Sequence, residues 1–126
     1  MARVLVATDR SDTAHRAVEW AAEMAERYEA DLVLLRVALD GDADELERDL
    51  AEYAGVFGER ARPVVRRGED PARVIVDAAR EEDVDVLVVG SVGMQGRKEF
   101  LLGNVPNRVS HNAPCTVVIV NTSDRQ

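Results

Sequence analysis

A glycine-rich stretch near the end of the chain offers the clearest chemistry in this sequence. Residues 90–104 read GSVGMQGRKEFLLGN, with glycines at positions 90, 93, 96 and 103. Glycine lets the backbone approach a ligand closely and adopt positive φ, so that successive N–H groups can converge on an anion. Arg97 and Lys98 add local positive charge to an acidic chain. The stretch therefore predicts either a phosphate-binding loop or an ordinary flexible connection.

The composition limits what such a loop can serve. The chain has 126 residues and a formal net charge of −8, which indicates one domain over residues 1–126 and argues against a general nucleic-acid binder. The opening MARVLVATD lacks the pattern of a secretion signal, and no apolar run approaches the ~20 residues that span a bilayer. We therefore expect a cytoplasmic protein without a membrane span. For the single cysteine, Cys115, we expect the role of a small buried side chain rather than that of a reactive thiol.

The elements that would position the loop follow from five apolar runs of strand length. The runs cover residues 3–8, 31–37, 62–67, 85–90 and 115–120. Four are almost continuously apolar, which is typical of parallel strands covered on both faces, whereas 62–67 is more polar and fits an edge strand. Helical spacing of apolar residues predicts helices over 12–28, 43–57, 71–82 and 104–112. The alternation predicts an α/β fold: an open, doubly wound, Rossmann-like parallel sheet of five strands with helices on both faces.

This fold would place the glycine-rich loop beside a crevice. With strand order 3-2-1-4-5, the order reverses between the first and fourth strands, and ligands bind beyond the carboxyl ends of strands at such a reversal. Asp9 ends the first strand and Gly90 ends the fourth. Gly103 and Asn104 open the last helix, whose first N–H groups lack intrahelical partners and favour an anion. The loop lacks the Walker pattern, so backbone amides would supply most of the binding.

The spacing of the glycines resembles a known signature. Gly90, Gly93 and Gly103, followed by a small polar residue, are similar to the G-x2-G-x9-G-[ST] nucleotide-binding signature of universal stress proteins. The stretches VLVATDRSDTAHRAVEWA, RGEDPARVIVDAAREEDVDVLVVGSVG and HNAPCTVVIV resemble successive parts of that family. The resemblance covers nearly the whole chain, in order. Asn104 stands where the family has Ser or Thr, and Arg10 stands where a glycine is common.

The resemblance implies a regulatory protein of the stress response that binds ATP, alone or with Mg²⁺, and forms a homodimer through its last strand, 115–120. It implies that Asp9 lies near the ribose or phosphates and Val37 near the adenine, while the glycines line the phosphates. The predicted nucleotide-binding residues are Asp9, Val37, Gly90, Gly93, Gly96, Arg97, Gly103, Asn104 and Val105.

Several of these residues also have simpler interpretations. Asp9 could serve only to turn the chain at the strand end, and the side chains of Arg97 and Lys98 could be solvated charges. His15 is predicted to be simply exposed, and Trp20 to lie in the core or at an interface. The sequence holds no nucleophile elbow and no cluster of catalytic carboxylates. We therefore expect no enzyme, with at most slow incidental ATP hydrolysis.

Two functions of different classes remain open from the sequence. The first is a nucleotide-responsive module in which ATP orders residues 91–103 and alters dimer or partner contacts. The alternative is a nucleotide-independent interaction module, in which the apolar strand 115–120 pairs edge to edge with a second copy or another protein. A substitution in the glycine loop should damage only the first.

Overall fold

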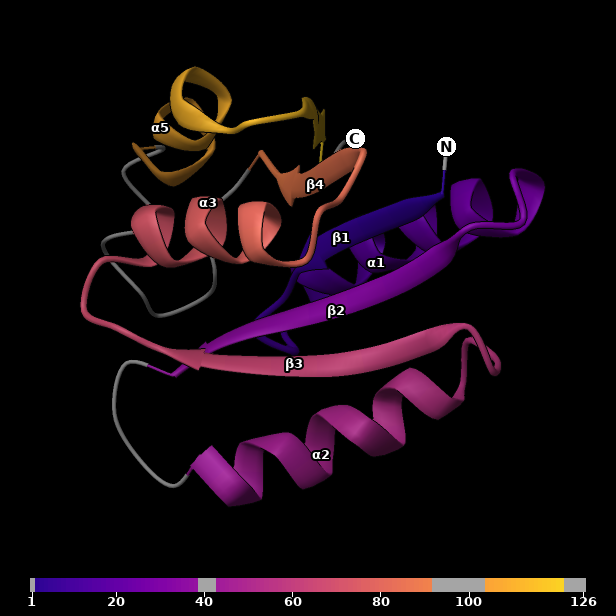
Figure 1. Ribbon diagram of the computed structural model, residues 1–126. Coiled ribbons are helices and arrows are strands. Elements are labelled where there is room, and N and C mark those ends of the chain that lie inside the picture. Colours follow the sequence, from indigo (N-terminus) through magenta and orange to yellow (C-terminus); the bar gives the residue numbers. More distant parts are fainter. Residues whose placement is uncertain (1, 39–42, 92–103, 122–126) are drawn as a thin grey trace, which may run out of the picture.

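The sheet has the strand order that the sequence predicts. In the computed structural model, which describes residues 2–38, 43–91 and 104–121, five parallel strands follow the order β3-β2-β1-β4-β5. Figure 1 shows this open, twisted sheet. The strands are β1 (Arg3–Ala7), β2 (Asp31–Ala38), β3 (Ala61–Arg67), β4 (Val86–Gly90) and β5 (Thr116–Val120). Each lies within two residues of its predicted bounds, and β3 is an edge strand as expected.

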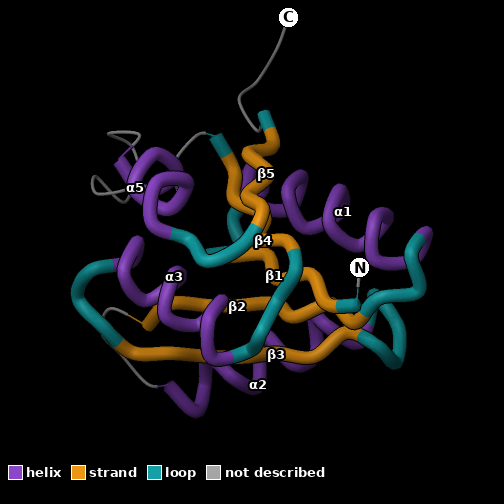
Figure 2. The backbone as a smooth tube through the Cα atoms, turned by 45° about the horizontal axis from the view of Figure 1, so that its top comes forward, coloured by secondary structure: helices purple, strands orange, loops and turns teal. Residues whose placement is uncertain are grey.

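Helices cover both faces of the sheet, which gives three layers (Figure 2). The helices are α1 (Asp12–Arg27), α2 (Ala43–Gly55), α3 (Pro71–Glu81) and α5 (Asn104–Asn112). One core cluster joins the sheet to α1 and α2, and the other joins it to α3 and α5. Because successive strand side chains point to opposite faces, Leu5 packs in one cluster and Val6 in the other. The strands are therefore apolar almost throughout.

Local signals fix where the first and third helices begin. Ser11 precedes α1, and its Oγ accepts a hydrogen bond from the Ala14 amide at 3.2 Å. This N-cap contributes about 1 kcal/mol to the stability of such a helix. Pro71 is the first residue of α3, a position that favours proline because the N–H group it lacks would have no intrahelical partner there. The Asp70 side chain, however, does not cap α3; it binds another helix, as described below.

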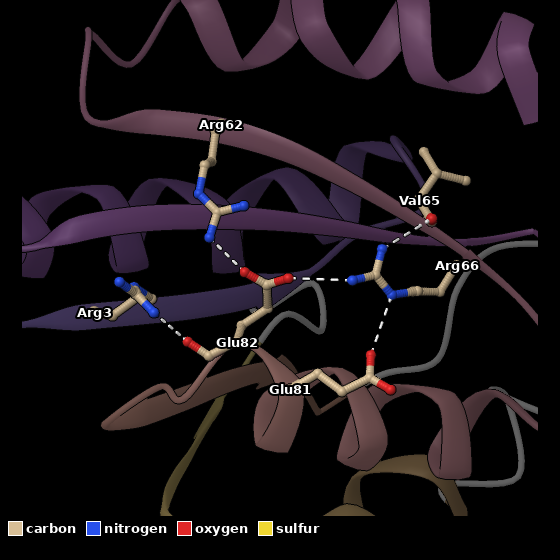
Figure 3. A network of polar contacts seen from close by, with 6 residues as sticks. All are labelled: Arg3, Arg62, Val65, Arg66, Glu81 and Glu82. Atoms are coloured by element: carbon tan, nitrogen blue, oxygen red, sulfur yellow. Dashed lines mark hydrogen bonds and ion pairs between the residues drawn. The ribbon is translucent and has the colours of Figure 1, made fainter.

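A network of ions fastens the β3 edge to the end of α3 (Figure 3). The carboxylate of Glu82 binds Arg62 and also Arg66, the latter at 3.1 Å. Glu81 contacts Arg66 at 3.4 Å, and the Arg3 guanidinium donates to the Glu82 carbonyl. Arg62, Val64 and Arg66 alternate along β3, so the arginines occupy the face on which α3 packs. Gly68, just after β3, permits the close approach of α3, because a Cβ there would lie 2.3 Å from Val74 Cγ2.

Candidate functional site

The first and fourth strands part at their carboxyl ends. Their register pairs Val4 with Val86, Leu5 with Leu87 and Val6 with Val88, and goes no further. Beyond that point the Thr8 amide donates to Leu35 of β2 at 2.9 Å, whereas the Ser91 amide donates to Val120 of β5 at 2.7 Å. Beyond β1 and β4, the chain thus hydrogen-bonds to the outer neighbouring strand, and not across the gap between β1 and β4. This divergence is the topological switch point at which open α/β sheets bind ligands.

The turn after β1 is built from its own polar side chains. Thr8 is 1% exposed, and its Oγ1 accepts a hydrogen bond from the Arg10 amide at 3.0 Å. Asp9 Oδ1 accepts from the Ser11 amide at 2.9 Å. Asp9 therefore has the turn-forming role that its position allowed. A carboxylate has two oxygens and about four acceptor sites, so this bond leaves capacity for a ligand.

Arg10 adopts a backbone conformation that favours glycine. Its φ is 71°, and for a residue with a Cβ this left-handed region costs roughly 1–2 kcal/mol. Its side chain has partners on α2: Nε donates to Asp49 Oδ2 at 2.9 Å, and the guanidinium lies 3.8 Å from the centre of the Tyr53 ring. These contacts, together with the hydrogen bond from the Arg10 amide to Thr8 Oγ1, offset the backbone cost and hold the turn against α2.

His15 belongs to an aromatic cluster between α1 and α2. Its Nδ1 shares a hydrogen bond with the Tyr53 hydroxyl, and its ring lies 5.6 Å from that of Tyr53 and 6.3 Å from that of Phe57. The prediction that His15 is simply exposed was wrong, although its side chain remains 42% exposed. Burial raises the pKa of Tyr53, with the charge of Arg10 opposing that rise. The cluster supports the turn beneath Arg10.

The end of β4 and the end of β2 supply two predicted site residues. Gly90 is the last residue of β4 and pairs with Val120, so it lies beside the parting of the strands. Ser91 follows it and donates from Oγ to Asn121 at 3.5 Å. Val37 lies near the carboxyl end of β2 and is half-buried, packed against the α3 and α5 core cluster. The carboxyl ends of parallel strands share one edge, so Asp9, Val37 and Gly90 lie along the same edge.

The last helix starts where the sequence predicts. Asn104 is the first residue of α5, and Val105 is 5% exposed in the core cluster beneath it. Gly93, Gly96, Arg97 and Gly103 fall in 92–103, outside the described residues. Their predicted contacts with phosphate therefore stay predictions.

An ion pair that sequence reasoning missed holds α5 to α3. Arg108 donates to both carboxylate oxygens of Asp70, at 2.9 and 2.7 Å. The hydrogen bonds and charge of Arg108 lower the pKa of Asp70. The two residues are far apart in sequence, and Asp70 carries a capping signal of its own, so no pattern identified the pair. The contact links the residue before α3 to the middle of α5.

The described part of the chain has neither a cluster of metal ligands nor a membrane-spanning helix. Among its residues, no group of three or more histidines, cysteines or acidic residues is arranged to hold a metal ion. No helix in the described part of the chain has both the length and the apolar character to cross a bilayer. Cys115 is half-buried rather than fully buried, and burial raises the pKa of its thiol.

Comparison with known proteins gives a consistent family. The model of the universal stress protein family matches residues 1–52 and 38–121. Universal stress protein YxiE of Bacillus subtilis is 30% identical, over 94% of this chain and 97% of its own. Universal stress protein Rv1636 of Mycobacterium tuberculosis is 33% identical, over 95% of this chain and 96% of its own.

Solved structures agree with the sequence relatives. A universal stress protein in complex with cAMP superposes with a TM-score of 0.78 and 31% identity, covering 97% of this chain and 98% of that one. The Archaeoglobus fulgidus universal stress protein in complex with dAMP superposes with a TM-score of 0.73 over 96% of this chain and 98% of its own; at 22% identity it shows a shared fold. Sequence and architecture together place this chain in the universal stress protein family.

Proposed function

We propose that this chain is an adenine-nucleotide-binding regulatory module of the stress response, with ATP as its ligand and without a catalytic role. The observation that carries the proposal is the parting of β1 and β4, which leaves Asp9 and Gly90 at one edge of the sheet. The similarity to a universal stress protein in complex with cAMP supports the same ligand class.

The chemistry of the described positions fits such a ligand. Asp9 would accept hydrogen bonds from ribose hydroxyls, because only its Oδ1 is engaged by the Ser11 amide. Val37 offers a half-buried apolar surface for a base. The unpaired first N–H groups of α5, beginning at Asn104, would face the phosphates together with the amides of residues 90–103. An acidic protein can bind an anion in this way without a basic surface.

Regulation would come from the glycine-rich loop. We expect ATP to order residues 91–103, which lie mostly outside the described part of the chain, and so to change dimer or partner contacts. A ligand shifts such an equilibrium only by its difference in affinity for the two states. The homodimer would form through β5, next to the strand from which the loop leaves the sheet.

Isothermal titration calorimetry tests this proposal. We expect ATP to bind with measurable heat, with and without Mg²⁺, and AMP and cAMP to compete for the same site. Gly93→Val should weaken ATP binding at least tenfold, about 1.4 kcal/mol, because a side chain would block the approach of the backbone to phosphate. Gly55→Val is the matched control, since a Cβ added at Gly55, at the end of α2, meets nothing within 4 Å. A flat titration at millimolar ATP would refute the nucleotide-binding function.

One observation favours the alternative function, a nucleotide-independent interaction module. β5 is an edge strand, and Ile119 on it is 46% exposed. Exposed apolar edge strands pair readily with other strands. If Gly93→Val binds no ATP yet associates and functions as the wild type does, the alternative accounts for this chain better.

A further inference from the structure

A groove lies at the opposite end of the strands from the candidate nucleotide site. It is formed by the second half of α1, the start of β2 and the connection from α2 to β3, and encloses about 630 Å³. These segments surround the amino ends of β2 and β3, whereas the nucleotide site lies at the carboxyl ends (Figure 1). The lining residues are Glu19, Ala22, Glu23, Ala25, Glu26, Glu29, Ala30, Leu32, Val56, Phe57, Glu59, Arg60 and Ala61.

The groove has an apolar floor. Two of its alanines lie on α1 and Ala30 directly precedes β2, while Leu32 of β2 is buried in the floor. Phe57 and Ala61 pack partly against the core cluster at the other side. Val56 is 75% exposed, the highest exposure among the large hydrophobic residues that the structure describes. Covering Val56 would remove apolar surface from water at roughly 25 cal/mol per Å², so the floor favours an occupant with apolar side chains.

The rim of the groove is strongly acidic. Five of the lining residues are glutamates and one, Arg60, is a cation. Glu23 is paired with Arg27 at 2.7 Å, and Glu19 contacts His15 at 3.3 Å. By contrast, Glu26, Glu29 and Glu59 form no ion pair with any other residue of the described ranges. Their charges are therefore available to a cationic partner.

The charge of this chain argues against a second copy as the partner. Residues 1–57 hold 14 of the 24 acidic residues and 6 of the 16 basic ones, so the whole net charge of −8 belongs to this part of the chain. A second copy brought to the groove through the same α1 and α2 layer would meet like charge, which opposes association. Charge complementarity therefore favours a basic partner over a second copy of this chain.

The spacing of the glutamates indicates the form of that partner. Glu19, Glu23 and Glu26 stand at i, i+4 and i+7 on α1, on one side of the helix and over about 10 Å of its length. We propose that the acidic groove binds a basic amphipathic helix of another protein. Its lysines or arginines, at matching spacing, would pair with the rim, and its apolar side chains would cover Val56 and the floor. A small polyamine would satisfy the rim but leave the floor uncovered.

Fluorescence anisotropy with a labelled synthetic helix tests this inference. The probe is a peptide of about 18 residues, long enough to form a helix on binding, with lysines at i, i+4 and i+7 and leucines along the adjacent face, so that both can enter the groove. Glu26→Gln with Glu59→Gln should weaken its binding about fivefold, as expected for the loss of two surface charge pairs. Val56→Ser should also weaken it, and neither change should reduce folding, since these side chains lie at the surface.

The matched control is Glu47→Gln with Glu52→Gln, two exposed glutamates on α2 outside the groove that give the same change in net charge. This control should bind the peptide as the wild type does. Equal weakening by both pairs of substitutions would show non-specific charge attraction and overturn the inference. So would equal binding of a scrambled peptide, tight binding of spermine alone, or self-association of the protein that the groove substitutions abolish. Because ATP is absent throughout, the result is independent of the proposed nucleotide site.

Discussion

The two edge strands of the sheet are finished in opposite ways. On β3, Arg62 and Arg66 extend over the side of α3 and share the carboxylate of Glu82, whose side chain is only 13% exposed. β3 also contains Pro63, which lacks an N–H group. On β5 there is no charged residue, and Ile119 is 46% exposed. Charged side chains and proline discourage strand pairing at an edge, and an uncharged apolar edge invites it.

This difference indicates how the domain can associate without uncontrolled aggregation. Because β3 carries arginines and a proline whereas β5 is uncharged, the proposed homodimer would form through β5. β5 also pairs with β4, from whose end the glycine-rich loop departs. A contact at β5 would therefore lie next to the candidate nucleotide site, which is how a ligand could influence association.

The largest effect should come from placing a charge on the edge strand β5. Ile119→Lys should raise the dissociation constant of a β5-mediated dimer roughly 100-fold, since it removes about 1.5–3 kcal/mol of apolar burial and adds a charge to be desolvated. Ile119 is a better target than Val118, which packs partly against the core cluster. Sedimentation velocity measures the change, with Arg62→Gln on β3 as the control. If Arg62→Gln dissociates a dimer and Ile119→Lys does not, the dimer forms through β3 rather than β5, which contradicts the expectation.

A smaller effect should follow from removing the carboxylate that binds the two arginines of β3. Glu82→Gln removes the charge that Arg62 and Arg66 share, and we expect the free energy of unfolding to fall by about 1–2 kcal/mol, a value reduced by the partial exposure of both arginines. Urea denaturation gives the change. Glu81→Gln is the matched control: its side chain is 61% exposed and makes one contact at 3.4 Å, so its effect should stay below about 0.5 kcal/mol. Equal losses for the two variants would mean that Glu82 has no special role.

The thiol that precedes β5 should react slowly. Burial, and secondarily the charge of Asp85, raise the pKa of Cys115, so less thiolate is present at a given pH than in the unfolded chain. At pH 8 we expect alkylation by iodoacetamide to be a few-fold slower in the native protein than in urea. A native rate equal to or above the unfolded rate would contradict the buried environment at the start of β5.

The smallest effect concerns the ion pair that holds α5 to α3. Arg108 lowers the pKa of Asp70 below its ordinary value of 3.8 in the folded state. The stabilisation is therefore fully present above that ordinary value and is lost as the pH falls through the lowered folded-state pKa. Wild type and Asp70→Asn should differ slightly in thermal stability at neutral pH, and the difference should disappear in strong acid. A difference that grows on acidification would mean that the sign of the pKa shift is wrong.

The architecture could be predicted because its signals are local. Apolar runs of strand length identified all five strands, the more polar run 62–67 was correctly assigned to an edge, and helical spacing of apolar residues located α1, α2, α3 and α5. Trp20 was correctly expected to pack, since it lies partly buried against the core cluster. Each of these features depends on residues close together in the sequence, where periodicity and capping chemistry act.

The contacts that position the site could not be predicted in the same way. Arg10 meets Asp49, His15 meets Tyr53, and Arg108 meets Asp70, each across 38 or 39 positions of sequence. Such pairs depend on how helices pack over the sheet, which hydrophobic periodicity does not specify. Asp70 precedes Pro71 at the start of α3, yet its carboxylate binds the Arg108 guanidinium of α5 through both oxygens and makes no capping hydrogen bond. The roles of Gly93, Gly96, Arg97 and Gly103 stay predictions, because these residues lie outside the described ranges.

Amide chemical shifts during an ATP titration test the central claim most directly. If ATP binds where β1 and β4 part, ¹⁵N–¹H spectra should show the largest shifts at Asp9, Arg10, Val37, Ser91 and Val105, with the groove residues Glu26 and Val56 unchanged. Absence of shifts at millimolar ATP, or shifts concentrated away from the carboxyl edge of the sheet, would contradict the account.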